Sequence, residues 1–271
     1  MLFNVGIVLQ AIDARVAPAR LALRFGLLLR LIRRPAWLVG WLLGIVGIWP
    51  QIIAYGKAPF VVVQPALAGG LLLMLILGAR VLHERVHVKD VLGVSAIIGG
   101  VALVAWGAPS HTEAHRPWLD VIAVVAALSF AGAVPFAVRG SRLDTGMLAI
   151  VACGCGFAAT NVATKLLGDD YDLGHDLNAA IWAAVVFVNG VSATLTNMTA
   201  FQRRKATIVV PISTAVQTFL PIVLEPLFLR EHWSSAAYDG APLFAGLALA
   251  CLGSVAVSAT AAVSDLYARA A

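Results

Sequence analysis

Charged residues are scarce in this sequence of 271 residues. Only 12% of the residues are Asp, Glu, Lys or Arg, whereas 61% are of hydrophobic types. A soluble domain has about 25% charged and about 45–50% apolar residues. A core of this size cannot bury so many apolar side chains, so the excess must face lipid. The composition therefore excludes an ordinary soluble enzyme and a disordered chain, and it predicts an all-α, polytopic integral membrane protein.

Cysteine is also scarce, and basic residues are not gathered into one surface. Cys153, Cys155 and Cys251 all lie within apolar runs, which is typical of packing residues rather than of a disulfide framework. The 19 basic residues are spread between apolar runs, although the net charge is +5. We therefore expect no nucleic-acid partner and no cofactor. The expected partners are the lipid bilayer and a small-molecule or ion substrate, and the sequence allows a homo-oligomer.

Long apolar runs predict about nine transmembrane helices. A hydrocarbon core about 30 Å thick requires roughly 20 helical residues, and continuous rather than alternating runs exclude strands. Met1–Ile12 is taken as helix one but has only half the required length, so either the start codon is misplaced or the native helix is a half-span. N-terminal sequencing of the native protein distinguishes the two. The eight longer runs are Trp37–Gly56, Ala58–Ala79, Val91–Ser110, Val121–Val138, Thr145–Thr164, Leu177–Gln202, Ala206–Leu229 and Gly240–Ser264.

The basic residues predict the orientation in the membrane. Connections on one side carry fifteen Lys and Arg and those on the other side carry four, so the first side should be cytoplasmic. The N-terminus is then outside and the C-terminus inside, in what we expect to be the plasma membrane. The segment Pro18–Arg34 is either an amphipathic helix in the headgroup region or a basic loop.

Two stretches of the chain resemble each other, which predicts an internal repeat. Predicted helix three begins near Pro65 and is followed by Glu84. Predicted helix eight begins near Pro211 and is followed by Glu231 in the same way. Glycine-containing helices follow in both cases, so the repeat unit has five helices. An odd number of spans inverts the second copy, and the acidic loop Asp169–Asp172 opposes the basic loop of the first copy. We expect one transporter domain over residues 1–271, with repeat one at 1–138, repeat two at 144–264 and the last repeat helix absent.

These features resemble a known superfamily. Two halves with an acidic turn after a Pro-led third helix and a Gly-rich fourth are similar to the drug/metabolite transporter (DMT) superfamily of EamA-like proteins. The usual Gly-Glu turn reads His83-Glu84 and Arg230-Glu231 here. Nine helices, Ala58-Pro59 and Gly107-Ala108-Pro109 are also similar to NIPA-type magnesium transporters. The resemblance implies alternating access around a central cavity, with a small metabolite or drug as substrate; the alternative is magnesium or another divalent cation.

Polar side chains within the apolar helices are candidates for the transport pathway. A carboxylate in hydrocarbon costs about 2.5–3.5 kcal/mol on insertion scales, so Glu225 should face a cavity or a partner. It either binds a cation or proton, or it lies near the outer surface and pairs with Arg230. The second half is the more polar, which predicts a wet cavity lined mainly by helices six, seven and eight. The predicted pathway residues are Gln10, Gln64, Asn161, Lys165, Asn189, Ser192, Thr196, Thr214, Gln217, Thr218 and Glu225.

The stretch His83-Glu84-Arg85-Val86-His87 has the H-E-x-x-H pattern of zinc proteases. The equivalent Glu231 lacks the second histidine, and no third ligand stands out. A zinc metalloprotease is therefore the least favoured alternative, and we expect that the protein is not an enzyme. The sequence does not identify a bound metal. No nucleotide-binding loop is present in the sequence, so the energy for transport should come from a gradient.

Overall fold

The computed structural model describes residues 2–57, 70–81, 86–107, 118–143, 145–172, 174–229 and 237–270, and these residues are helical with short connections. They form ten α-helices and two short 3-10 helices, η1 (Ala19–Leu21) and η3 (Ala237–Gly240). The predicted all-α class therefore holds for the described residues. The α-helices are α1 (Leu2–Val16), α2 (Phe25–Ile32), α3 (Pro35–Lys57), α5 (Gly70–Arg80), α6 (Val88–Gly107), α7 (Trp118–Ala137), α8 (Gly146–Asp172), α9 (Asp176–Arg203), α10 (Ala206–Leu229) and α11 (Ala241–Ala270).

Each apolar run of the sequence contains one of these helices, but two local predictions need correction. The predicted acidic loop Asp169–Asp172 is the last turn of α8. The segment Pro18–Arg34 is not one amphipathic helix, because Leu23 has a φ of 54° and separates η1 from α2. A leucine in this left-handed region is strained, and it is held there by burial to 4% exposure.

Four helices of the described part are long and apolar enough to cross a membrane. They lie in Val88–Gly107, Trp118–Ala137, Gly146–Thr164 and Asp176–Arg203. Shorter apolar helical stretches occur at Pro35–Gly44, Ala206–Pro221 and Ala241–Val257. Of the nine predicted spans, four are thus supported by the length and composition of their helices. Part of predicted helix three, residues 58–69, lies outside the described residues.

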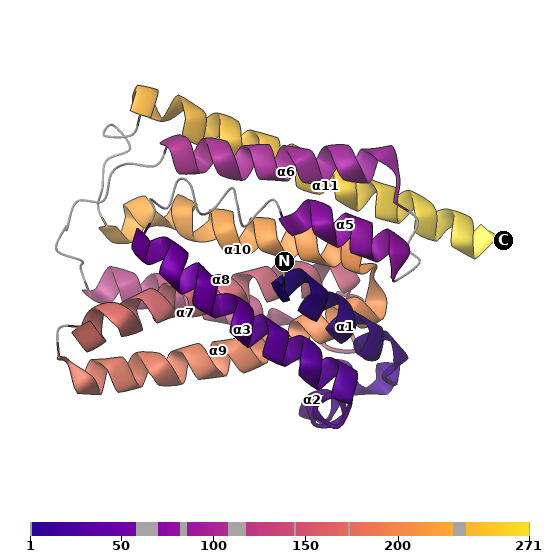
Figure 1. Ribbon diagram of the computed structural model, residues 1–271, viewed down its shortest axis with the longest axis horizontal. Coiled ribbons are helices and arrows are strands. Elements are labelled where there is room, and N and C mark those ends of the chain that lie inside the picture. The colour runs from indigo at the N-terminus through magenta and orange to yellow at the C-terminus, as the bar shows by residue number, and fades with distance from the viewer. Residues whose placement is uncertain are drawn as a thin grey trace.

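The long helices lie side by side and run roughly along one direction (Figure 1). One cluster of buried residues draws side chains from α1, α5, α6, α8, α9, α10 and α11, so the first and second halves of the chain share a core. The helix α7 packs on the outside of α8 and α9 through two smaller clusters. The pathway candidates on α8, α9 and α10 therefore lie in neighbouring helices.

Glycines set the distance between α6 and α11, which run antiparallel next to each other (Figure 1). A Cβ atom on Gly100 would lie 2.6 Å from the Gly246 carbonyl oxygen, and one on Gly246 would lie 2.6 Å from that of Gly100. Gly93 and Gly253 face each other in the same way, at 2.8 and 2.5 Å. The backbones of the two helices are thus in direct contact, which only glycine permits.

Candidate functional site

The polar stripe predicted on α9 is largely buried, and its donors are used within the helix. Thr196 is 0% exposed and donates its hydroxyl to the Ser192 carbonyl at 2.9 Å. Asn189 is 8% exposed and donates from Nδ2 to the Val185 carbonyl at 3.1 Å. Buried donors need partners, and these two find them without leaving α9. Thr196 and Asn189 therefore stabilise the packed helix, whatever they contribute to a pathway.

The polar face predicted on α10 lies at the edge of the core. Thr214, Gln217 and Thr218 are half-buried, whereas Ser213 is buried and bonds to the Val210 carbonyl. Since α10 is one continuous helix, Glu225 falls within about 100° of arc from these three positions. The side chain of Glu225 is not among those described. The four residues of the predicted stripe therefore lie on one helix. The role of the Glu225 carboxylate stays a prediction.

The remaining candidates are dispersed. Asn161 is exposed on α8, and Lys165 lies in the same helix with its side chain outside the description. Gln10 is half-buried on α1, where a Cβ on Gly40 of α3 would lie 3.2 Å from its Cγ. Gln64 lies outside the described residues. Gln10 is thus placed at the contact between α1 and α3, and its place in a pathway stays a prediction.

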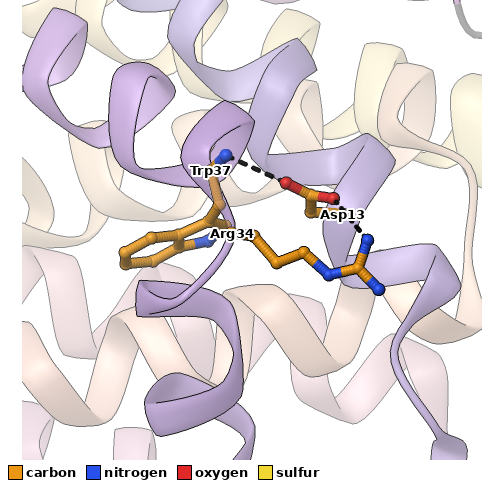
Figure 2. A network of polar contacts seen from close by, with 3 residues as sticks. All are labelled: Asp13, Arg34 and Trp37. Atoms are coloured by element: carbon orange, nitrogen blue, oxygen red, sulfur yellow. Dashed lines mark hydrogen bonds and ion pairs between the residues drawn. The ribbon is translucent and has the colours of Figure 1, made fainter.

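A buried carboxylate joins α1 to the beginning of α3. Asp13 is 8% exposed; its Oδ2 accepts the backbone N–H of Trp37 at 2.9 Å, and its Oδ1 lies 3.7 Å from Nη1 of Arg34 (Figure 2). The first N–H groups of a helix have no partner within the helix. Asp13, on α1, supplies a hydrogen-bond acceptor to one of these N–H groups of α3. Its negative charge is also favourable at the N-terminus of that helix.

The same part of the chain is bonded to the end of α9. The Leu23 N–H donates to the Thr199 hydroxyl at 3.0 Å, and Nε2 of Gln202 donates to the Ala17 carbonyl at 3.2 Å. The indole N–H of Trp37 lies 3.3 Å from the Met198 sulfur. Three polar contacts thus fasten residues 17–37 to the last two turns of α9. We call these contacts the N-terminal clasp.

The sequence analysis did not single out Asp13 as a structural residue. The sequence did contain a signal for this role, since Asp13 is an acidic residue at the end of an apolar helix and directly precedes the arginines of residues 15–34. A carboxylate in such a place requires a hydrogen-bond donor or a cation as its partner. Its partners were not predictable from spacing, because Trp37 lies 24 positions away and the geometry depends on how α1 packs on α3.

The opposite end of α9 is acidic. Asp170, in the last turns of α8, lies 3.4 Å from Nδ1 of His175, whose backbone N–H bonds to the Asp170 carbonyl at 2.8 Å. The helix α9 has 28 residues, so it is about 42 Å long. This length separates the acidic turn from Arg203 at the other end. The acidic turn and Arg203 therefore lie at opposite ends of a helix that is long and apolar enough to cross a membrane.

A second buried carboxylate, Asp90, begins α6. Its Oδ2 accepts the His87 backbone N–H at 2.8 Å, as an acidic residue at the third position of a helix does in a capping box. Asp90 is 5% exposed, and its other oxygen has no hydrogen-bond partner among the described residues. Within the same described part, no three His, Cys, Asp or Glu residues gather as a metal site. The histidine and glutamate of the H-E-x-x-H pattern, His83 and Glu84, lie outside it.

Comparison with known proteins links the first half of the chain to transport. The family model "Magnesium transporter NIPA" matches residues 27–131, from α2 to the last turns of α7. No curated protein and no solved structure matches the chain. Together with the long apolar helices, the match supports an integral membrane protein that is similar, over these residues, to a family of magnesium transporters.

Proposed function

We propose that the protein transports magnesium or a related divalent cation across a membrane. The match of residues 27–131 to the magnesium transporter family carries this proposal, because it covers most of the helices of the first half. It favours the cation alternative of the sequence analysis over an organic metabolite or drug. The match does not extend to the second half of the chain, whose proposed role rests on its polar and acidic side chains.

The second half offers the oxygen ligands that a hard cation requires. Mg²⁺ keeps several waters and binds through one or two carboxylates. Glu225 is an acidic residue within an apolar helix, and Thr214, Gln217 and Thr218 share its face of α10. An ionisable residue within a span marks an ion pathway more often than a structural contact. We therefore place the cation pathway along this face of α10, with the acidic turn of Asp170 attracting cations to one mouth.

The contact between α6 and α11 supports two inverted repeats of residues 1–138 and 144–264. In the sequence, Gly93 corresponds to Gly246, and Gly100 corresponds to Gly253. A two-fold axis between the copies requires that a contact from Gly93 to Gly253 be matched by one from Gly246 to Gly100. Both contacts are present. Two antiparallel copies of one module would produce this pattern, as would any antiparallel pair of helices that carries glycines seven residues apart on the facing sides.

The N-terminal clasp fits a transporter that opens alternately to the two sides. It joins repeat one to repeat two at the basic end, through Leu23 with Thr199 and Ala17 with Gln202. The positive-inside rule places this end in the cytoplasm. Rocking of one repeat against the other would break the clasp and open the pathway inward.

Magnesium flux through the purified protein tests the proposed function. In liposomes that contain the full chain and enclose a magnesium-sensitive dye, the dye signal should rise when Mg²⁺ is added outside, because Mg²⁺ enters. We expect Glu225→Gln to lower the initial rate at least about tenfold, because the substitution removes the charge that offsets the desolvation of the cation. Arg142→Gln, which removes an exposed charge from the connection after α7, should keep the rate within about twofold.

The two parts of the proposal fail separately. A wild-type protein that moves no divalent cation, or that exchanges an organic solute with no effect of metal, contradicts the function. A wild-type flux that Glu225→Gln leaves intact contradicts the pathway alone.

A further inference from the structure

The short helix α2 has three distinct sides. Leu27, Leu28 and Leu31 are buried against the rest of the protein. Phe25, Leu29 and Ile32 are 59%, 52% and 49% exposed and form one apolar stripe, since they are four and three residues apart. This stripe has no protein partner among the described residues.

The third side of α2 is basic. Arg30 lies in the last turn, and Arg33 caps the helix in a helical conformation, with φ −80° and ψ −4°. On the helical wheel the two side chains stand about 60° apart and directly beside the apolar stripe. Both are exposed, and neither forms an ion pair with an acidic residue in the described part of the chain. Two further exposed arginines precede them, Arg20 in η1 and Arg24 directly before α2.

The position of α2 places these sides at the membrane surface. The clasp bonds the segment before α2 to the last turns of α9, and α9 is long enough to cross the bilayer. The helix α2 therefore lies near the end of α9, and Figure 1 shows it at the lower edge of the molecule, next to α3. At that level an exposed apolar stripe meets acyl chains, and arginines beside it meet lipid phosphates.

We propose that α2 binds anionic phospholipids of the leaflet at the basic end of the protein. The apolar stripe enters the boundary of the acyl chains, and Arg30 and Arg33 pair with the headgroup phosphates. Charge complementarity selects this occupant, because arginine forms two-pronged hydrogen bonds with phosphate. Among the residues that the structure describes, no carboxylate pairs with Arg30 or Arg33. The inference depends on membrane integration and goes beyond the proposed transport of magnesium.

Native mass spectrometry of the full-length protein tests this binding. The protein is titrated in neutral detergent with phosphatidylglycerol or with zwitterionic phosphatidylcholine of the same chains. We expect the wild type to retain phosphatidylglycerol in preference, and Arg30→Gln/Arg33→Gln to lower that preference about tenfold. The matched control is Arg139→Gln/Arg142→Gln, which removes two exposed arginines from another connection and should keep the preference.

Four outcomes would overturn the proposal. Equal retention of the two lipids by the wild type is one, and an unchanged preference in Arg30→Gln/Arg33→Gln, folded as judged by an unchanged melting temperature, is another. Displacement of phosphatidylglycerol by millimolar inorganic phosphate is the third, because it would indicate a site for small anions. Loss of dimers rather than of lipid in the variant would assign the stripe to a second copy of the chain instead.

Discussion

Replacing Gly100 by alanine is expected to destabilise the protein by about 1–3 kcal/mol. The new Cβ would lie 2.6 Å from the Gly246 carbonyl oxygen and 2.8 Å from the Ala250 Cβ. The neighbouring atoms are backbone or sit directly on it, so they cannot rotate away and the two helices must separate. Thermal unfolding of the purified protein in detergent, followed by tryptophan fluorescence, measures the change.

Two further variants make this prediction specific. Gly190→Ala places a Cβ where no atom lies within 4 Å, so it should leave the protein unchanged or stabilise it by up to about 1 kcal/mol, the helix propensity of alanine over glycine. The pair Gly100→Ala/Gly246→Ala should cost less than the sum of the single substitutions, because one separation of the helices accommodates both methyl groups. Additive costs would show that the two glycines do not meet.

Removing the carboxylate of Asp13 is expected to cost about 1–3 kcal/mol of stability. In Asp13→Ala the N–H of Trp37, a residue only 3% exposed, loses its acceptor, and a buried donor without a partner carries that penalty. Asp13→Asn keeps an acceptor of the same size and loses only the charge opposite Arg34. It should recover much of the stability, because Arg34 is partly exposed and its pairing is screened by water.

The same unfolding measurement distinguishes these contributions. A loss in Asp13→Asn as large as that in Asp13→Ala would assign the stability to the ion pair rather than to the capped helix. Asp176→Ala, at the exposed beginning of α9, serves as the control for removing an acidic residue that has no comparable tertiary role, and it should change the stability by less than about 1 kcal/mol.

The long helices could be predicted from the sequence because each one contains a continuous apolar run. Val121–Val138 and α7, for example, differ by a few residues at the ends. The end of α8 was missed because Asp169–Asp172 is rich in charge, whereas helix formation continues there regardless of polarity. The break at Leu23 was missed because the contacts that hold it are tertiary, namely the burial of its side chain and a hydrogen bond to Thr199, 176 positions away.

The pathway was harder to predict than the helices. Hydrophobic patterning identifies polar residues within spans, such as Thr196 and Asn189, but it does not show that they use their donors on their own helix. Conversely, Asp13 looked like the end of a helix and proved to be a buried tertiary cap. A side chain's partner depends on packing between distant segments, and a single sequence contains no record of that packing.

Accessibility of single cysteines tests the central claim, that two copies of one module cross the membrane in opposite directions. In a chain whose native cysteines are replaced by alanine, Ala19→Cys reports on the connection after α1, and Leu177→Cys reports on the equivalent connection after α8; both positions are exposed. A third variant, Leu143→Cys, reports on the connection between the repeats, where Leu143 is exposed. In cells treated with a membrane-impermeant thiol reagent, we predict labelling of Leu177→Cys alone, and labelling of the other two only after the membrane is opened. Labelling of Ala19→Cys and Leu177→Cys from the same side would contradict the account.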